Sequence, residues 1–294
     1  PPRSTLFPYT TLFRSDLGSW DDFIHLVDDI HKRKMKLMID IVFNHTARDA
    51  KYVDQHPHWY VRNARGELAN RVGDWSDIAD LDFKHDDLRA FLIDVLAFWA
   101  PHVDGFRCDV APLIPLDFWM EARQQVDIIN PDLIWLSESV HPGFIKYLRD
   151  LGFECHSDSE MYQVFDILYD YDIFEDMNAY LKDPKTLSLW MDAIERQETI
   201  YPENYIKLRS FENHDQPRLR SKVRDEAHFK QMVALSFFLK GSSFIYAGME
   251  HQSTHHPSLF EYDEVKWQPS LSLEPFFRRL ALFKKQPIFT HGQF

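Results

Sequence analysis

The 294-residue chain has few cysteines, a deficit of positive charge and no long apolar run. Two cysteines, Cys108 and Cys155, are too few for a disulfide framework, and we expect both to be buried structural thiols. The 33 Lys and Arg residues face 46 Asp and Glu residues, and the net charge of -13 argues against a nucleic-acid partner. No apolar stretch approaches the roughly 20 residues that span a bilayer, so we expect a soluble protein without membrane contact.

From residue 21 onward, helix-like segments alternate with short apolar strands. Residues 21–35 have helical apolar periodicity and run directly into a β-branched stretch at 36–45. Further strands are predicted at residues 103–109, 133–139, 153–159, 205–215 and 242–248, with a closing helix at 273–286. This alternation predicts a parallel sheet covered by helices, either a (β/α)8 barrel or an open doubly wound sheet.

Polar side chains gather where four of these strands end. They are Asp40, Asn44, His45, Arg107, Asp109, Glu138, His214 and Asp215. In a barrel the carboxyl ends of the strands meet on one face, where active sites lie. A single polar strand end is usually only solvated, but the repetition over four strands favours a shared site.

Four short motifs carry a family resemblance. DIVFNH (40–45), GFRCDVA (105–111), ES (138–139) and FENHD (211–215) resemble, in order, the four sequence regions of the α-amylase superfamily, glycoside hydrolase family thirteen. IADLDF (78–83) resembles the fifth region of that family, and FIYAGME (244–250) is similar to its last barrel strand. The resemblance implies an α/β fold, a (β/α)8 TIM-type barrel that is incomplete because its first two strands are missing.

The resemblance assigns roles to three carboxylates. It implies that Asp109 is the nucleophile, Glu138 the general acid/base, and Asp215 the group that holds sugar hydroxyls and steadies the transition state. Retaining cleavage needs two carboxyl groups about 5 to 5.5 Å apart, one ionised and one protonated. Arg107 precedes Asp109 by two positions, so strand alternation places both side chains on one side and the arginine keeps Asp109 ionised. Glu138 follows an apolar run and faces two other carboxylates, which favours its protonated form.

Several further residues are candidates for substrate contact. His45 and His214 match family positions that hydrogen-bond the sugar at the cleavage point. Residues 46–83 predict a small irregular insertion after the first visible strand, and its Trp59, Tyr60 and Trp75 either stack on sugar rings or pack. We include Arg107 and Trp75 among the substrate-binding candidates, and we expect Asp40 to have a structural role.

The sequence gives little support for a metal. Asn44 matches a calcium-ligand position, but the Lys-His pair that follows the nucleophile in many secreted α-amylases is replaced by DVAPLIP (109–115). We therefore expect no cofactor requirement, with calcium left open. HQSTHH (251–256) is interpreted as a loop without metal, and the acidic run at 158–176 as a solvated face.

These observations predict a retaining α-glucan or maltooligosaccharide hydrolase that works by double displacement, of the maltodextrin- or cyclodextrin-acting type. A transglycosylase, a sucrose- or trehalose-acting enzyme and a non-catalytic binding subunit remain alternatives. A metal-dependent barrel hydrolase is disfavoured because DIVFNH lacks the HxH spacing. The oligomeric state is open, and so is the choice between a cytoplasmic and a secreted protein, from a bacterial source.

The first 15 residues, PPRSTLFPYTTLFRS, do not fit this pattern. They back-translate, codon for codon, to a common DNA sequencing adapter, and we exclude them as an artefact. We expect residues 16–294 to be a partial catalytic barrel whose uninterrupted gene supplies two preceding strands and a following β-sandwich. With unpaired strand edges, the fragment itself is expected to be inactive.

Overall fold

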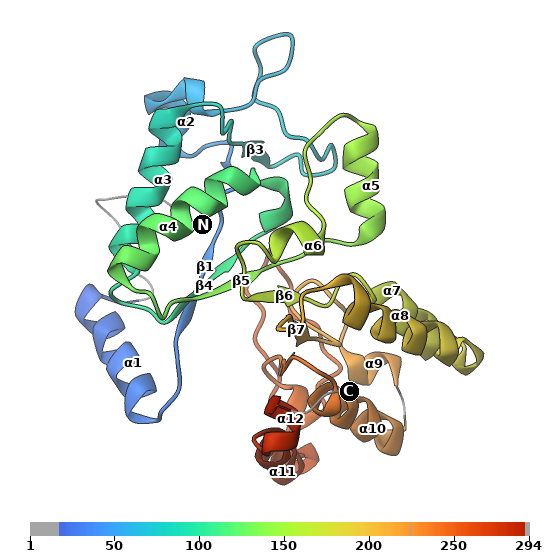
Figure 1. Cartoon of the computed structure of the whole chain (residues 1–294). Helices are drawn as coiled ribbons and strands as arrows, with labels where there is room; N and C mark the ends of the chain where they lie inside the picture. The colour runs from blue at the N-terminus through green and yellow to red at the C-terminus, as the bar shows by residue number, and fades with distance from the viewer. Residues whose placement is uncertain (1–17, 224, 292–294) are drawn as a thin grey trace. The chain divides into compact units, whose positions relative to one another are not determined.

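The computed structural model describes residues 18–223 and 225–291 (Figure 1). The chain divides into two compact units, Pro1–Leu168 and Tyr169–Phe294. The stretch interpreted as adapter lies outside the described residues.

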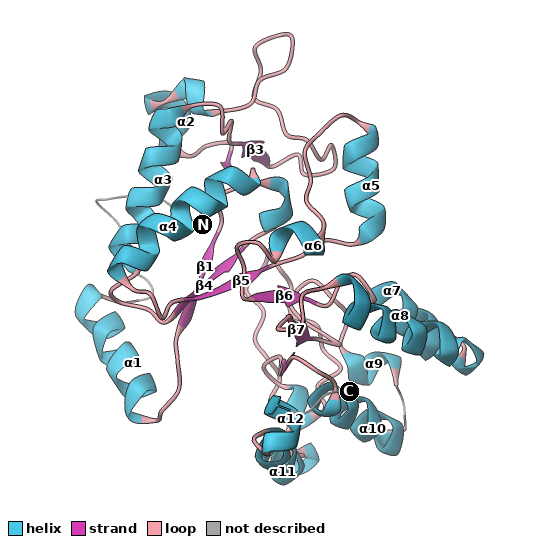
Figure 2. Ribbon diagram, in the orientation of Figure 1, coloured by secondary structure: helices cyan, strands magenta, loops and turns pink. Residues whose placement is uncertain are grey.

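Parallel strands form the centre of the first unit. Each strand pairs with the next in register, so that Asp40 lies opposite Arg107 and Arg107 lies opposite Leu136. The adjacent strands β1, β4 and β5 are visible side by side in Figure 2. The strands are β1 (Met38–Ile41), β4 (Gly105–Cys108), β5 (Ile134–Ser137) and β6 (Ile167–Tyr169), of which β6 crosses into the second unit. This register brings the carboxyl ends of β1, β4 and β5 to one level.

Helices precede and separate these strands along the chain. They are α1 (Trp20–Lys32), α3 (Asp86–Trp99), α4 (Leu116–Ile129), α5 (Pro142–Asp150) and α6 (Asp158–Met161). The helix α1 begins at a capping box, in which the Ser19 hydroxyl accepts from the Asp22 amide and the Asp22 carboxylate accepts from the Ser19 amide. The α3 helix buries Leu88, Leu92 and Leu96, spaced four residues apart, and packs against α4.

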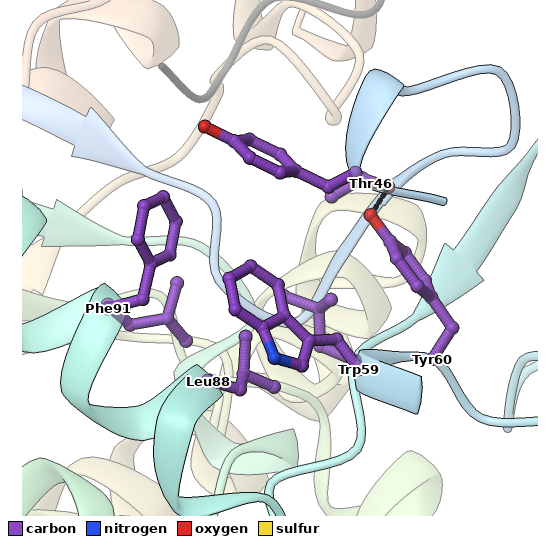
Figure 3. Close-up of a pocket in the computed structure, with 8 residues that line it drawn as sticks. Thr46, Trp59, Tyr60, Leu88 and Phe91 are labelled. Atoms are coloured by element: carbon purple, nitrogen blue, oxygen red, sulfur yellow. Dashed lines mark hydrogen bonds between the residues drawn. The ribbon is translucent and has the colours of Figure 1, made fainter. Parts of the chain in front are cut away.

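The insertion after β1 contains a small antiparallel pair, β2 (His45–Ala47) and β3 (Ile78–Asp80). Between them lie α2 (Lys51–Gln55) and the short 3-10 helix η1 (Pro57–Trp59). Trp59 is 4% exposed and lies among Leu88, Phe91 and Tyr60, where the Thr46 hydroxyl donates to the Tyr60 hydroxyl (Figure 3). Trp59 and Tyr60 therefore pack, which resolves the choice between packing and sugar stacking for these two residues.

The second unit contains the parallel strands β7 (Ile206–Arg209) and β8 (Ser242–Ser243). Its helices are α7 (Phe174–Lys182), α8 (Leu187–Ile200), α9 (Leu219–Lys222), α10 (Glu226–Phe238), α11 (Glu274–Lys284) and α12 (Pro287–His291), with 3-10 turns η3 (Pro184–Thr186), η4 (Met249–His251) and η5 (Pro269–Leu271). The predicted closing helix is α11. None of the helices in the described ranges combines the length and the apolar character that a bilayer span requires.

Two predictions about residues 153–176 are wrong. Residues 153–159 do not form a strand, because Ser157 begins α6 through a capping box with Glu160, and the strand β6 comes later. The acidic run is not a solvated face throughout, since Asp158 and Asp170 are each 5% exposed. The Asp170 carboxylate accepts from Arg209 at 2.9 Å, so a buried cation compensates its charge.

Candidate active site

The pairing of β1, β4 and β5 positions two predicted site residues. The Asp109 amide donates to the Ile41 carbonyl at 2.9 Å, and the Glu138 amide donates to the Cys108 carbonyl at 3.0 Å. These hydrogen bonds continue the strand ladder for one residue beyond the ends of β4 and β5. Asp109 and Glu138 therefore leave adjacent strands at the same end of the sheet.

Arg107 is the centre of the charge arrangement in the first unit. Its Nη1 donates to Asp40 at 2.7 Å and to Asp109 at 2.8 Å, and its Nη2 lies 2.6 Å from Glu138 Oε1. The arginine side chain is only 11% exposed, whereas Asp40 is 54% exposed. The predicted contact between Arg107 and Asp109 is present. The contact with Glu138 was not predicted, and it means that one guanidinium holds both carboxylates.

The residue after Asp109 has a strained backbone. Val110 has a φ of 35°, a left-handed conformation that a β-branched residue rarely adopts. In this conformation the Val110 amide donates to Glu138 Oε2 at 2.9 Å. Strain of this kind persists where surrounding contacts hold it, and it often marks functional sites. Sequence reasoning missed Val110, because a valine carries no signal for a positive φ.

Neither cysteine takes part in this arrangement. Cys108 lies between Arg107 and Asp109 in the sequence, and its side chain is fully buried. This burial raises the pKa of its thiol well above the ordinary value. Burial also raises the pKa of Cys155 to about 11. Both thiols therefore stay protonated at neutral pH, and the prediction of two buried structural cysteines is confirmed.

His45 and Trp75 lie together in the first unit. Their ring centroids are 6.1 Å apart, and both side chains are half-buried. His45 Nδ1 lies 3.1 Å from the amide nitrogen of Asn44, which makes it the acceptor in that hydrogen bond. Burial lowers the pKa of His45, although the Asp109 carboxylate opposes this effect. A neutral histidine near Asp109 is suited to hydrogen-bonding a hydroxyl group.

The surroundings of Asn44 do not fit a calcium cage. Its side-chain oxygen accepts from Arg71, and the same guanidinium donates to Asp80 at 2.8 Å and to the Leu113 carbonyl at 2.6 Å. Asn44 is fully buried, and the side chain of Asp80 is 2% exposed. The Asn44 side-chain oxygen and Asp80 Oδ2 are therefore already bound to a cation that belongs to the chain, the Arg71 guanidinium. Arg71 was missed in the sequence because no motif includes it.

His214 and Asp215 lie in the second unit. The His214 ring nitrogen is 3.2 Å from Asp215, and the two side chains are 43% and 39% exposed. The Asp215 amide donates to the Asn213 side chain at 2.9 Å, and the Asn213 amide group donates to the Tyr171 hydroxyl at 2.7 Å. These hydrogen bonds fix the backbone that carries His214 and Asp215. Their convergence with Asp109 and Glu138 stays a prediction.

A buried ion pair between Glu212 and Arg218 lies in the same segment. Glu212 accepts from Arg218 at 2.9 Å and from the Leu219 amide at 2.6 Å, and both charged side chains are almost fully buried. Burial raises the pKa of Glu212, while these two donors act in the opposite direction. The pair encloses His214 and Asp215 between its members in the sequence. Of the motif FENHD, only the last two residues were assigned from the sequence, and the pair of Glu212 and Arg218 was missed.

The histidines of residues 251–256 lie outside the α-helices and strands. They lie in the turn η4 and in the irregular segment that follows it. His255 pairs with Asp263 at 2.8 Å. Within the described ranges, the clusters with three potential metal-ligand atoms do not include these histidines. The interpretation of this segment as a loop is confirmed.

Comparison with known proteins identifies the family. A model of the alpha amylase catalytic domain matches residues 10–64 and 55–271. The alpha-amylase MalA of Haloarcula japonica is 32% identical over 247 residues, which cover 80% of this chain and 34% of that protein.

Two solved structures are similar over almost the whole chain. An alpha-amylase from Lactobacillus plantarum superposes with a TM-score of 0.87 and 41% identity, covering 94% of this chain and 65% of that one. A noncanonic maltogenic alpha-amylase, AmyB from Thermotoga neapolitana, gives a TM-score of 0.80 and 33% identity, with coverage of 93% and 61%. The chain thus spans about a third of its curated relative and less than two thirds of each structure. These superpositions confirm the predicted α/β fold of the (β/α)8 barrel type, and the chain belongs to the alpha-amylase family.

Proposed function

We propose that the chain carries the catalytic machinery of a retaining hydrolase of α-glucans and maltooligosaccharides. The observation that carries this proposal is the bridge from Arg107 to Asp109 at 2.8 Å and to Glu138 at 2.6 Å. Asp109, which we assign to attack, and Glu138, which we assign to proton transfer, directly follow the adjacent strands β4 and β5, and this supports the proposal. Two carboxyl groups with these separate tasks are what glycosidic cleavage with retention requires.

In the proposed first step, a carboxylate oxygen of Asp109 attacks the anomeric carbon of the bound glucosyl unit. The glycosidic carbon–oxygen bond breaks, and Glu138 gives its proton to the departing oxygen. In the second step Glu138 takes a proton from water, the water oxygen attacks the anomeric carbon, and the bond to Asp109 breaks. Two displacements at one carbon return the original α configuration, and both carboxyl groups regain their starting states.

Arg107 and Val110 prepare these carboxyl groups. The Arg107 guanidinium donates a charge-assisted hydrogen bond to Asp109 at 2.8 Å, which holds that carboxylate in a fixed direction. Each oxygen of Glu138 faces a donor, Arg107 on one side and the Val110 amide on the other. A protonated oxygen cannot also accept along the same line, so Glu138 must release one of these contacts when it holds the proton that it transfers.

The other predicted site residues take supporting roles in this proposal. His45 and His214 hydrogen-bond the sugar at the cleavage point, Asp215 holds its hydroxyls, and Trp75 offers an aromatic face for a neighbouring sugar ring. Trp75 is half-buried and lies near His45, which supports that placement. The contacts of Arg71 with Asn44 and Asp80 support a domain without a calcium requirement.

Two of the alternatives that the sequence leaves open differ from the hydrolase in the fate of the bound glucan. A transglycosylase would pass the sugar from Asp109 to a hydroxyl of a second sugar, and a binding subunit would hold the glucan without cleaving it. A cytoplasmic and a secreted enzyme are both compatible with this chemistry.

Product analysis on maltotriose, cyclodextrin, pullulan and starch tests the proposal, with the full product of the gene that encodes this chain. We expect reducing sugars of α configuration, and we expect D109N to lower kcat by roughly 10⁴-fold or more. D104N is a matched control, because Asp104 and Asp109 are each 20% exposed and ion-paired, yet Asp104 contacts His31 and the Leu37 amide. Normal turnover in D109N would overturn the proposal, as would binding without any turnover in the wild type.

A further inference from the structure

Three side chains with potential metal-ligand atoms meet in the first unit, where the insertion contacts the start of α3. His58, His85 and Asp87 each offer a ligand atom, and these three atoms lie within 4.8 Å of one another. His58 belongs to η1 of the insertion, His85 caps α3, and Asp87 lies in the first turn of α3. The cluster therefore joins two segments that are 27 residues or more apart in the chain, counting from His58 to His85.

The ligand types select among cations. Two imidazole nitrogens and one carboxylate oxygen form a typical set for Zn²⁺ and for other borderline divalent transition metals. Calcium and magnesium prefer cages made of oxygen alone, which this cluster does not provide. The chemistry thus favours an ion such as Zn²⁺.

The distances allow such an ion with small side-chain movements. Tetrahedral zinc with bonds of about 2.0 to 2.1 Å separates its ligand atoms by about 3.3 Å. His58 Nε2 now lies 2.8 Å from Asp87 Oδ2, a hydrogen bond that the ion would replace. The two side chains are 49% and 56% exposed, so they have room to open this distance. His85 Nε2 lies 3.9 Å from Asp82 Oδ2, which places a further carboxylate within reach of the fourth position.

One ligand is already oriented by the protein core. The Trp59 indole donates to Asp87 Oδ2 at 2.8 Å. Trp59 is held on its other sides by a stacked contact with His56, at 3.9 Å between centroids, and by the side chains of Leu88 and Phe91 (Figure 3). Hydrogen bonds from such outer partners orient the ligands of protein metal sites. A solvated ion pair between His58 and Asp87 would not need this buried support.

Two electrostatic effects on a bound cation oppose each other at this cluster. The start of α3 carries the positive end of the helix dipole, which disfavours a cation. Against this, the carboxylates of Asp82, Asp86 and Asp87 lie within the same six residues and supply negative charge. Full carboxylate charges exceed the partial charge of about half a unit at a helix end.

We propose that His58, His85 and Asp87 bind one Zn²⁺ ion, with Asp82 or water in the fourth position. The ion fastens η1 of the insertion to the start of α3. Its role is structural, and it is separate from the proposed sugar chemistry of Asp109 and Glu138.

Calorimetric titration of the metal-free chain with ZnCl2 tests this proposal. We expect one equivalent to bind, H85Q and H58Q each to weaken this binding by about tenfold or more, and CaCl2 or MgCl2 not to compete. H31Q is the control, because His31 also pairs with a single aspartate, Asp104 at 2.7 Å, and is 47% exposed against 49% for His58. Equal Zn²⁺ affinity in H85Q and the wild type would overturn the proposal, and so would the absence of saturable binding.

A second measurement guards against a folding artefact. Zn²⁺ that binds only the native state raises Tm as its concentration increases. We expect this rise in the wild type and in H31Q, and its loss in H85Q, whose Tm without metal should match that of the wild type because the side chain is 37% exposed. A Zn²⁺-dependent rise of the same size in H85Q would contradict the site.

Discussion

A single guanidinium links three carboxylates in the first unit. Arg107 contacts Asp40, Asp109 and Glu138 through its two terminal nitrogens, and only 11% of its side chain is exposed. The planar fork of arginine can hold separate carboxylates in fixed directions, whereas a lysine ammonium acts as one point charge. The geometry of the proposed site therefore depends on this residue type as well as on its charge.

We expect R107K to lower kcat by roughly 10²- to 10³-fold, because it removes preorganised donors from both carboxyl groups. The measurement is steady-state hydrolysis of maltotriose, with thermal melting to establish that the variant is folded. R89K is the control, since Arg89 also bridges two carboxylates, Asp117 and Glu121 at 3.0 Å each, and is 16% exposed. Equal losses in R107K and R89K would contradict a specific role for Arg107.

His45 gives a prediction about pH. Burial lowers its pKa, so the native state favours the neutral ring, while the unfolded chain titrates near the ordinary value of about 6.5. The neutral ring therefore contributes stability above about pH 6.5, and this stability is lost as the pH falls below that value. We expect the free energy of unfolding of the wild type to fall faster than that of H45Q between about pH 6.5 and pH 5. An NMR titration that places the pKa of His45 at or above its ordinary value would refute this.

At the scale of elements, Arg71 connects the insertion to two other segments. It reaches Asn44 after β1, Asp80 on β3 and the Leu113 carbonyl before α4. Asp80 is almost fully buried, so its charge depends on this partner. The Arg71 guanidinium thus supplies the positive charge that a bound cation would supply in an oxygen cage.

We expect R71M to lower the free energy of unfolding by about 3 to 5 kcal/mol, because it leaves the buried Asp80 carboxylate without its cation. Chemical denaturation measures this loss. R48M is the control in the same insertion: Arg48 donates to the backbone carbonyls of Leu68 and Ile78, and its loss should cost about 1 kcal/mol or less. Added CaCl2 should leave the Tm of the wild type unchanged, and a rise would show that Arg71 does not satisfy the site.

The sequence predicted helices and strands well where the apolar pattern of a single segment was sufficient. The predicted helix at 21–35 is α1 with its capping box, and the strands at 36–45, 103–109 and 133–139 contain β1, β4 and β5. The strand predicted at 153–159 failed because Ser157 and Glu160 make a helix start there, a local signal stronger than two apolar residues. The burial of Asp170 was not predictable locally, because its partner Arg209 is 39 residues away.

At the scale of the whole molecule, the predicted site residues are distributed over the two units. Asp109 and Glu138 belong to the first unit, and His214 and Asp215 belong to the second. The order of the four motifs was sufficient to predict the family, which the comparisons confirm. It could not predict Val110, Arg71 or the pair of Glu212 and Arg218, because these depend on backbone strain and on contacts between distant segments.

A double-mutant cycle tests whether the two units act together. We expect D215N to lower kcat by roughly 10³-fold, through the loss of transition-state stabilisation. Combining it with D109N should add little further loss, because residues that act as one unit have strongly non-additive effects. Losses that simply multiply in the double variant would indicate that Asp215 acts independently of Asp109.

The proposed double displacement requires that Asp109 forms a covalent bond with the sugar. A fluorinated α-maltosyl fluoride, which forms the glycosyl-enzyme but hydrolyses slowly, should leave the enzyme carrying one maltosyl group. Peptide mass spectrometry should then find that group on Asp109, and D109N should remain unlabelled. A label on Glu138 or on another carboxylate, or full turnover without any labelled enzyme, would contradict the account.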